Sequence, residues 1–225
     1  DDDDTFHLIF TKQQYHLYKN KINLILSNIK IHHLYKIDEH NLGPVNSVLK
    51  ITNIPKNAEI IISYCDFFVK WNYNNFKRSV YGFDGAIPCF KNFHPASYGD
   101  TLYAYIKTDK ENNFIELKEK EHFTKNRHNE PASTGIYYFK NFSIFKKYSL
   151  KLNKELNKYQ ERYVSLLFNL MKKNNLSIKV TFVDKFICLG TPKDLINFKF
   201  WYSYFNTKRK KNKRHIFDQL NLVPM

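Results

Sequence analysis

A run of β-branched residues that ends in an acid constrains this chain more than any other feature. Ile60, Ile61 and Ile62 are apolar, as in a strand buried on both faces of a sheet, and the run stops at Asp66. A carboxylate at the end of a buried strand is costly unless it has a partner. Ligands of open α/β sheets bind at the carboxyl ends of strands, so Asp66 is a candidate metal or phosphate ligand. The alternative is that Asp66 only caps the following turn.

The segments around this run alternate between strand and helix patterns. The order β-α-β-α-β up to Asp66 predicts an α/β fold with a mixed, mostly parallel sheet flanked by helices. Farther along, two strand patterns around a polar turn predict an antiparallel hairpin insertion. We expect strands over residues 5–10, 30–37, 85–90, 101–108, 114–118, 133–139, 177–183 and 185–189, and helices over 12–27, 73–80, 143–157, 161–173 and from Pro44 and Pro192.

The length of 225 residues fits one domain, which we place at residues 1–205, followed by a basic tail at 206–225. The net charge of +15 raises the question of nucleic-acid binding, but the excess is spread along the chain. Lys, Asn, Ile, Tyr and Phe are abundant, as in proteins encoded by AT-rich sequences. A solvated tail is therefore the better interpretation, and a nucleic-acid partner is not expected.

Neither the composition nor the amino end indicates a membrane protein. An apolar run of about 18 residues is absent, and Asp1 to Asp4 are unlike a signal peptide. Cys65, Cys89 and Cys188 are widely spaced and odd in number, which favours reduced thiols over disulfides or zinc. We expect a cytoplasmic protein with no membrane partner, and the oligomeric state stays open.

The common zinc, serine-hydrolase and P-loop motifs are absent. The order of small and acidic residues at strand ends and loops, however, resembles the sugar-phosphate nucleotidyltransferases, which have a GT-A-like nucleotide-binding fold. The resemblance runs from about Thr5 to Phe205. It rests on Leu42-Gly43-Pro44-Val45, Cys65-Asp66, Tyr98-Gly99, Glu119-Lys120, Ser133 to Phe139, and Leu189 to Leu195.

The resemblance implies roles for single residues. Gly43 would lie against the nucleobase, and Asp66 would bind Mg²⁺ at the nucleotide phosphates. Glu119 would accept hydrogen bonds from sugar hydroxyls, and Lys120, a catalytic residue together with Asp66, would neutralise phosphate charge. The substrates would be a nucleoside triphosphate and a sugar 1-phosphate, with release of pyrophosphate. The remaining substrate-binding residues would be Gly99, Ser133, Thr134, Gly135 and Glu161.

The sequence departs from the family pattern in two places. The glycine-rich loop with Arg and Lys that follows the first strand in the family is absent before Thr5, so we expect a weakly active or inactive fragment. A second Mg²⁺-binding aspartate is replaced by Cys188, and a thiol is a poor Mg²⁺ ligand. The metal would then be held by Asp66 with waters and phosphates, or with help from Glu161 or Asp184.

Two other functions stay open. One is a nucleotide-sugar-binding or regulatory pseudo-enzyme, favoured by Cys188 and the missing loop. The other is a basic RNA-associated domain, which would use the tail and the many Tyr and Phe residues.

Overall fold

The first half of the chain forms the expected alternation of strands and helices. The computed structural model describes residues 4–29, 32–92, 94, 102–157 and 160–209, with side chains as far as 206. Thr11 caps the first helix, because its hydroxyl accepts a hydrogen bond from the amide of Gln14 and the Gln14 side chain accepts one from the amide of Thr11. The elements up to the acid are β1 (Phe6–Thr11), α1 (Lys12–Leu26), β2 (His32–Ile37), α2 (Pro44–Val48) and β3 (Ile60–Ser63).

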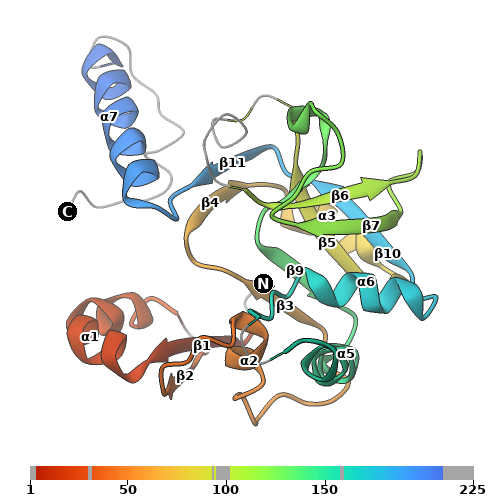
Figure 1. The fold of residues 1–225 in the computed structure, drawn as a ribbon. Coiled ribbons are helices and arrows are strands. Elements are labelled where there is room, and N and C mark those ends of the chain that lie inside the picture. Colours follow the sequence, from red (N-terminus) through yellow and green to blue (C-terminus); the bar gives the residue numbers. More distant parts are fainter. Residues whose placement is uncertain (1–3, 30–31, 93, 95–101, 158–159, 210–225) are drawn as a thin grey trace.

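The central sheet contains most of the remaining strands, while β1 and β2 form a separate parallel pair (Figure 1). Its order is β3-β9-β5-β8-β6-β7, and β10 also pairs with β5. The predicted hairpin is confirmed as the antiparallel pair β6 and β7. The bounds are β5 (Gly85–Phe90), β6 (Ala104–Thr108), β7 (Phe114–Glu119), β8 (Ala132–Ser133), β9 (Ile136–Phe139) and β10 (Ile178–Phe182), with the short helix η1 (Arg127–Asn129) before β8.

The α/β class is confirmed, but parallel pairs do not predominate within the described residues. Only β1 with β2 and β10 with β5 are parallel, whereas β9 runs antiparallel to both β3 and β5. Because β9 lies between them, β3 and β5 still share one direction. The prediction missed this arrangement because strand patterns do not show that a later strand inserts between two earlier ones.

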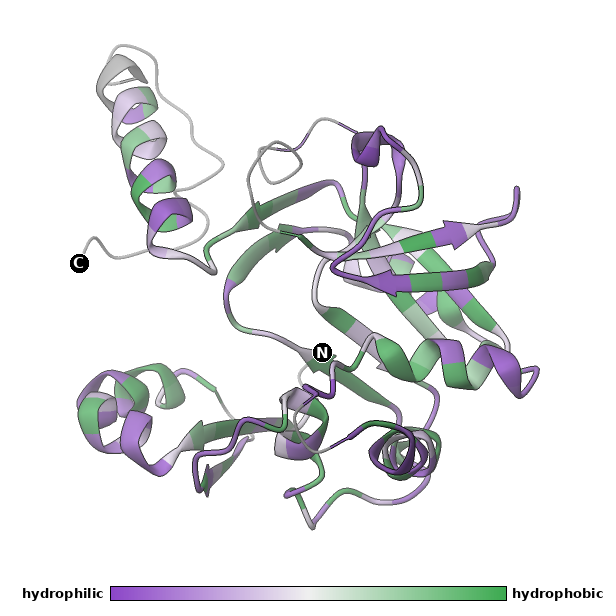
Figure 2. Ribbon diagram, in the orientation of Figure 1, coloured by the Kyte–Doolittle hydropathy of each residue, from purple (hydrophilic) through white to green (hydrophobic). Residues whose placement is uncertain are grey.

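The central sheet is covered on both faces. Ile87 and Tyr137 point into the large core with the helices α5 (Phe142–Glu155) and α6 (Leu166–Lys173), whereas their neighbours Ala86 and Tyr138 pack against α3 (Tyr73–Val80). This alternation is the period of two of a strand with two covered faces. In Figure 2 hydrophobic residues accordingly recur along the strands of the central sheet and along α6.

Three local predictions need correction. β3 is an edge strand within the described residues and leaves Ile61 38% exposed, so it is not buried on both faces. The expected strand over 133–139 is divided into β8 and β9, because Gly135 has a φ of 88° that interrupts an extended backbone. The helix expected from residue 161 begins only at Leu166, which leaves residues 161–165 as a connecting segment.

The last elements extend from one end of the sheet. β4 (Phe67–Lys70) pairs antiparallel with β11 (Lys185–Cys188), and α7 (Pro192–Arg209) follows and projects away from the central sheet (Figure 1). Part of the predicted tail, residues 206–209, thus continues α7, and residues 210–225 lie outside the described residues. No helix in the described part of the chain has both the length and the apolar character to cross a membrane.

The amino-terminal cap of α5 allows a first test of the fold. The Asn141 side chain accepts a hydrogen bond of 2.9 Å from the amide of Ile144. Asn141→Ala removes this cap and should lower the free energy of unfolding by about 1 kcal/mol in urea denaturation. Lys151→Ala, at an exposed position of the same helix, serves as the control and should change it by less than about 0.5 kcal/mol. Equal effects of the two substitutions would contradict the capping role.

Candidate functional site

Asp66 lies in the turn between β3 and β4, with an exposed side chain. The backbone joins this turn to the end of β11, because the amide of Leu189 donates to the carbonyl of Asp66 over 2.8 Å. A Cβ atom on Gly190 would lie 2.7 Å from Oδ2 of Asp66, so the carboxylate lies directly over this glycine. Within the described residues the Asp66 side chain accepts no hydrogen bond, which gives no support to the turn-capping alternative.

Cys188 lies beside this carboxylate. Its Sγ would be 3.6 Å from the same Cβ position on Gly190, and its thiol donates to Oδ2 of Asp194 over 3.6 Å. Asp194 is in the first turn of α7 and also accepts hydrogen bonds from the amide and hydroxyl of Thr191. Burial is the main cause that raises the pKa of the Cys188 thiol. The thiol therefore stays protonated near neutral pH and is no substitute for a carboxylate.

The residues around Asp66 fit a mode of Mg²⁺ binding that uses few protein ligands. Asp184 lies at the opposite end of β11 from Cys188, so it does not complete a carboxylate pair with Asp66. The described residues contain no group of three or more His, Cys, Asp or Glu side chains placed to hold a metal. Mg²⁺ is commonly bound by one or two carboxylates together with water and substrate phosphates, and a single exposed Asp66 is compatible with that mode.

Glu119 and Lys120 end β7 on the other side of the site. The Glu119 carboxylate accepts a hydrogen bond from the hydroxyl of Ser165, which is fully buried. Lys120 has a φ of 58°, and its ammonium group donates to the hydroxyl of Tyr163 over 2.6 Å. A residue other than glycine in the left-handed region is strained, and such strain concentrates at functional sites.

The Ser133, Thr134 and Gly135 turn connects β8 with β9 and faces the same region. The Ser133 hydroxyl accepts from the amide of Gly135 and donates to Tyr137, each over 3.1 Å. The Thr134 hydroxyl instead donates to the carbonyl of Pro88 over 2.9 Å, so its contact is structural. A Cβ atom on Gly135 would lie 3.0 Å from the ring of Phe67 and 3.2 Å from the ring of Tyr64. This turn therefore packs directly against the segment that carries Asp66.

One connecting segment contacts the loop around Gly43, Tyr64, Glu119 and Lys120. Residues 161–165, named here the bridging segment, lie between α5 and α6. The backbone of Arg162 accepts from Val45 over 3.1 Å and donates to Leu42 over 2.9 Å, on both sides of Gly43. The amide of Val164 donates to the hydroxyl of Tyr64 over 3.4 Å. Toward Glu119 and Lys120, the segment presents Ser165, Tyr163 and Glu161, and Glu161 is 4.0 Å from the Lys120 ammonium group.

The structure thus places most of the predicted site residues around the bridging segment. Gly43 contacts it directly, Asp66 is joined to it through Tyr64, and Glu161 belongs to it. Gly99 lies outside the described residues. Two further residues of the segment, Arg162 and Ser165, connect parts of the site and were not predicted from the sequence. Both are buried. The sequence signal for these two residues is a polar stretch inside the apolar pattern that predicts a helix.

Comparison with known proteins identifies the family. The model of the nucleotidyl transferase family matches residues 3–202. This chain belongs to that family. No curated protein sequence matches it.

Solved structures of low sequence identity share the fold of this nucleotidyl transferase. A nucleoside-diphosphate-sugar pyrophosphorylase from Vibrio cholerae RC9 is 16% identical with a TM-score of 0.65, and the match covers 87% of this chain and 80% of that one. An inositol-1-phosphate CTP transferase from T. maritima is 10% identical with a TM-score of 0.58 and coverages of 84% and 71%. HddC from Yersinia pseudotuberculosis is 16% identical with a TM-score of 0.56 and coverages of 87% and 78%.

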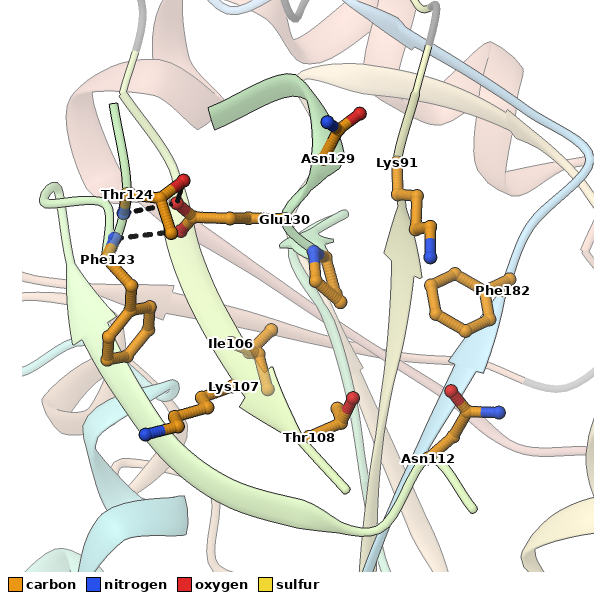
Figure 3. Close-up of a pocket in the computed structure, with 11 residues that line it drawn as sticks. Lys91, Ile106, Lys107, Thr108, Asn112, Phe123, Thr124, Asn129, Glu130 and Phe182 are labelled. Atoms are coloured by element: carbon orange, nitrogen blue, oxygen red, sulfur yellow. Dashed lines mark hydrogen bonds between the residues drawn. The ribbon is translucent and has the colours of Figure 1, made fainter. Parts of the chain in front are cut away.

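A separate shallow pocket of about 470 Å³ lies elsewhere on this nucleotidyl transferase (Figure 3). Its wall includes Glu130, whose carboxylate accepts hydrogen bonds from the amides of Phe123 and Thr124 over 2.8 and 2.6 Å. None of the predicted site residues lines it. The Glu130 carboxylate is satisfied by the loop around it, so this acid organises the loop.

Proposed function

We propose that this nucleotidyl transferase transfers a nucleotidyl group from a nucleoside triphosphate to a sugar 1-phosphate or a similar phosphate. The observation that carries the proposal is the convergence of Gly43, Asp66, Glu119 and Lys120 on the bridging segment. These residues are scattered over nearly 80 positions of the sequence, yet their types are those that bind a nucleotide, a metal ion, a polyol and a phosphate.

The reaction would be an in-line displacement at phosphorus. An oxygen of the sugar phosphate attacks the α-phosphorus of the triphosphate, the bond to the bridging oxygen of the β-phosphate breaks, and pyrophosphate leaves with its electron pair. The protein contributes positioning and charge neutralisation. Lys120 supplies a cation beside the phosphate, and Glu119 orients the sugar by accepting a hydrogen bond from a hydroxyl group.

Asp66 is the residue that would hold Mg²⁺, which when bound neutralises charge on the nucleotide phosphates. Cys188 is protonated and bonded to Asp194, so we assign it no metal ligation. A single protein carboxylate should hold the metal weakly in the absence of substrate. The nucleotide phosphates would then supply much of the metal affinity.

Gly43 has two compatible roles. A Cβ atom there would lie 2.6 Å from the amide nitrogen of Arg162, so the bridging segment already requires glycine. The same absence of a side chain would let a nucleobase approach the loop. The second role follows from the family resemblance, whereas the first explains the glycine without a ligand.

We further propose that the described elements form part of a larger nucleotide site. Within the described residues, β3 ends the central sheet and β1 pairs only with β2. Open strand edges are ready to pair with another strand. A strand between β1 and β3, followed by a glycine-rich phosphate-binding loop, would join the two sheets and add the triphosphate contacts expected of the family.

The test is turnover by the natural gene product with Mg²⁺. We expect pyrophosphate release only when a suitable nucleoside triphosphate and a sugar 1-phosphate are both present, and calorimetry should detect binding of the triphosphate. If the protein binds these substrates but converts none of the nucleoside triphosphates and sugar 1-phosphates tested, the pseudo-enzyme is favoured. The proposal fails if neither triphosphates nor sugar phosphates bind.

A further inference from the structure

Buried hydroxyl groups lie between the Ser133 turn and Glu119. The amide of Gly135 donates to Ser133, and Ser133 donates to the hydroxyl of Tyr137. Tyr137 lies close to both Ser165 and Glu119, and Ser165 donates to Oε2 of Glu119. The three hydroxyl-bearing residues are at most 3% exposed. Solvent therefore does not compete for these hydrogen bonds.

The proton of each serine hydroxyl has a defined acceptor. A hydroxyl group has one proton to donate. Ser165 gives its proton to Glu119, and Ser133 gives its proton to the hydroxyl of Tyr137. The single proton of Ser165 is thus used to hold the Glu119 carboxylate.

We propose that Ser165 is a positioning residue that fixes Oε2 of Glu119 and leaves Oε1 to accept a hydrogen bond from a polyol phosphate. Oε1 has no hydrogen-bond partner within the described residues. The inference rests on the proposed function, because it specifies which oxygen receives the sugar. Ser165 acts through Glu119 and does not itself contact the substrate.

The groups around Glu119 influence whether its carboxyl group is protonated or charged. Burial is the largest influence and raises the pKa of the Glu119 carboxyl, and the negative charge of Glu161 also raises it. The hydrogen bond from Ser165 and the charge of Lys120 oppose this rise. Tyr64 and Tyr137 face the same carboxylate as neutral phenols, because burial raises the pKa of both.

Ser165→Ala removes one of the two influences that lower this pKa. The pKa of Glu119 should therefore rise further, and the charged, accepting form should be lost at a higher pH as the pH falls. Ser165→Thr keeps the hydroxyl and should restore the wild-type titration.

The first measurement is a ¹³C NMR titration of the Glu119 carboxyl in the ligand-free protein, with the signal assigned by its loss in Glu119→Gln. Ser149→Ala is the matched control, because Ser149 is fully buried and its hydroxyl has no hydrogen-bond partner. An unchanged titration in folded Ser165→Ala, or an equal shift in Ser149→Ala, would overturn the positioning role. This result would leave the proposed function untouched.

The second measurement is steady-state kinetics. Ser165→Ala should raise the KM for the sugar phosphate about tenfold, with a smaller change in kcat, because it misplaces a group that binds the substrate. The acid limb of the pH profile should move to higher pH in parallel with the NMR titration. An altered titration in a protein that turns over no sugar phosphate would support the positioning of Glu119 and overturn the proposed function.

Discussion

Asp66→Asn should reduce pyrophosphate formation by about 10²–10³-fold at saturating substrates. The substitution keeps the shape of the side chain and its packing against Gly190, but removes the charge that would hold the metal. Removal of a single preorganised electrostatic contact to a transition state commonly costs this much. Because Asp66 is exposed and bears no structural hydrogen bond among the described residues, the free energy of unfolding should change by less than about 0.5 kcal/mol.

Asp184→Asn is the matched control for this experiment. Asp184 is also exposed and belongs to the same strand pair, but it lies at the end of β11 away from Cys188. Its substitution should leave the rate within about twofold of wild type, since surface charges at a distance are screened. The assignment of Asp66 would be wrong if both variants lost the same activity, or if Asp66→Asn stayed within about threefold of wild type.

The Asp66 turn illustrates what could be predicted from the sequence. The apolar run before Asp66 and the glycine at 190 are local signals, and the structure brings the two segments together. The character of β3 could not be predicted in the same way, because three isoleucines suit both a central and an edge strand. Its neighbours are set by long-range pairing with β9, which begins more than 70 residues later.

In the bridging segment, by contrast, the local sequence pattern predicts the wrong structure. Tyr163 and Leu166 fit a helical period, and a helix was expected from residue 161, but the backbone of Arg162 is bonded to the loop around Gly43 instead. Tertiary contacts override local propensity here, as they often do in helices. The site depends on this deviation, because residues 162 and 165 of a helix would lie on one face, whereas here Arg162 contacts the loop around Gly43 and Ser165 contacts Glu119.

Gly43→Ala should lower the free energy of unfolding by about 3 kcal/mol, as measured by urea denaturation. Two costs combine at this position. The φ of 84° with a ψ of 173° lies in a region that is essentially restricted to glycine, and this term amounts to about 1–3 kcal/mol. The new Cβ atom would also lie 2.6 Å from the Arg162 nitrogen and 3.0 Å from its carbonyl oxygen, so backbone must move, at a further cost of about 1–3 kcal/mol.

Gly82→Ala separates the two costs. Gly82 has nearly the same φ, 85°, but a Cβ atom there would meet nothing within 4 Å. Its substitution should therefore show only the conformational term of about 1–2 kcal/mol. The difference between the two variants measures how firmly the loop is held against the bridging segment. Equal destabilisation would mean that the segment yields easily, and Gly43 would then be required by its backbone conformation and not by packing.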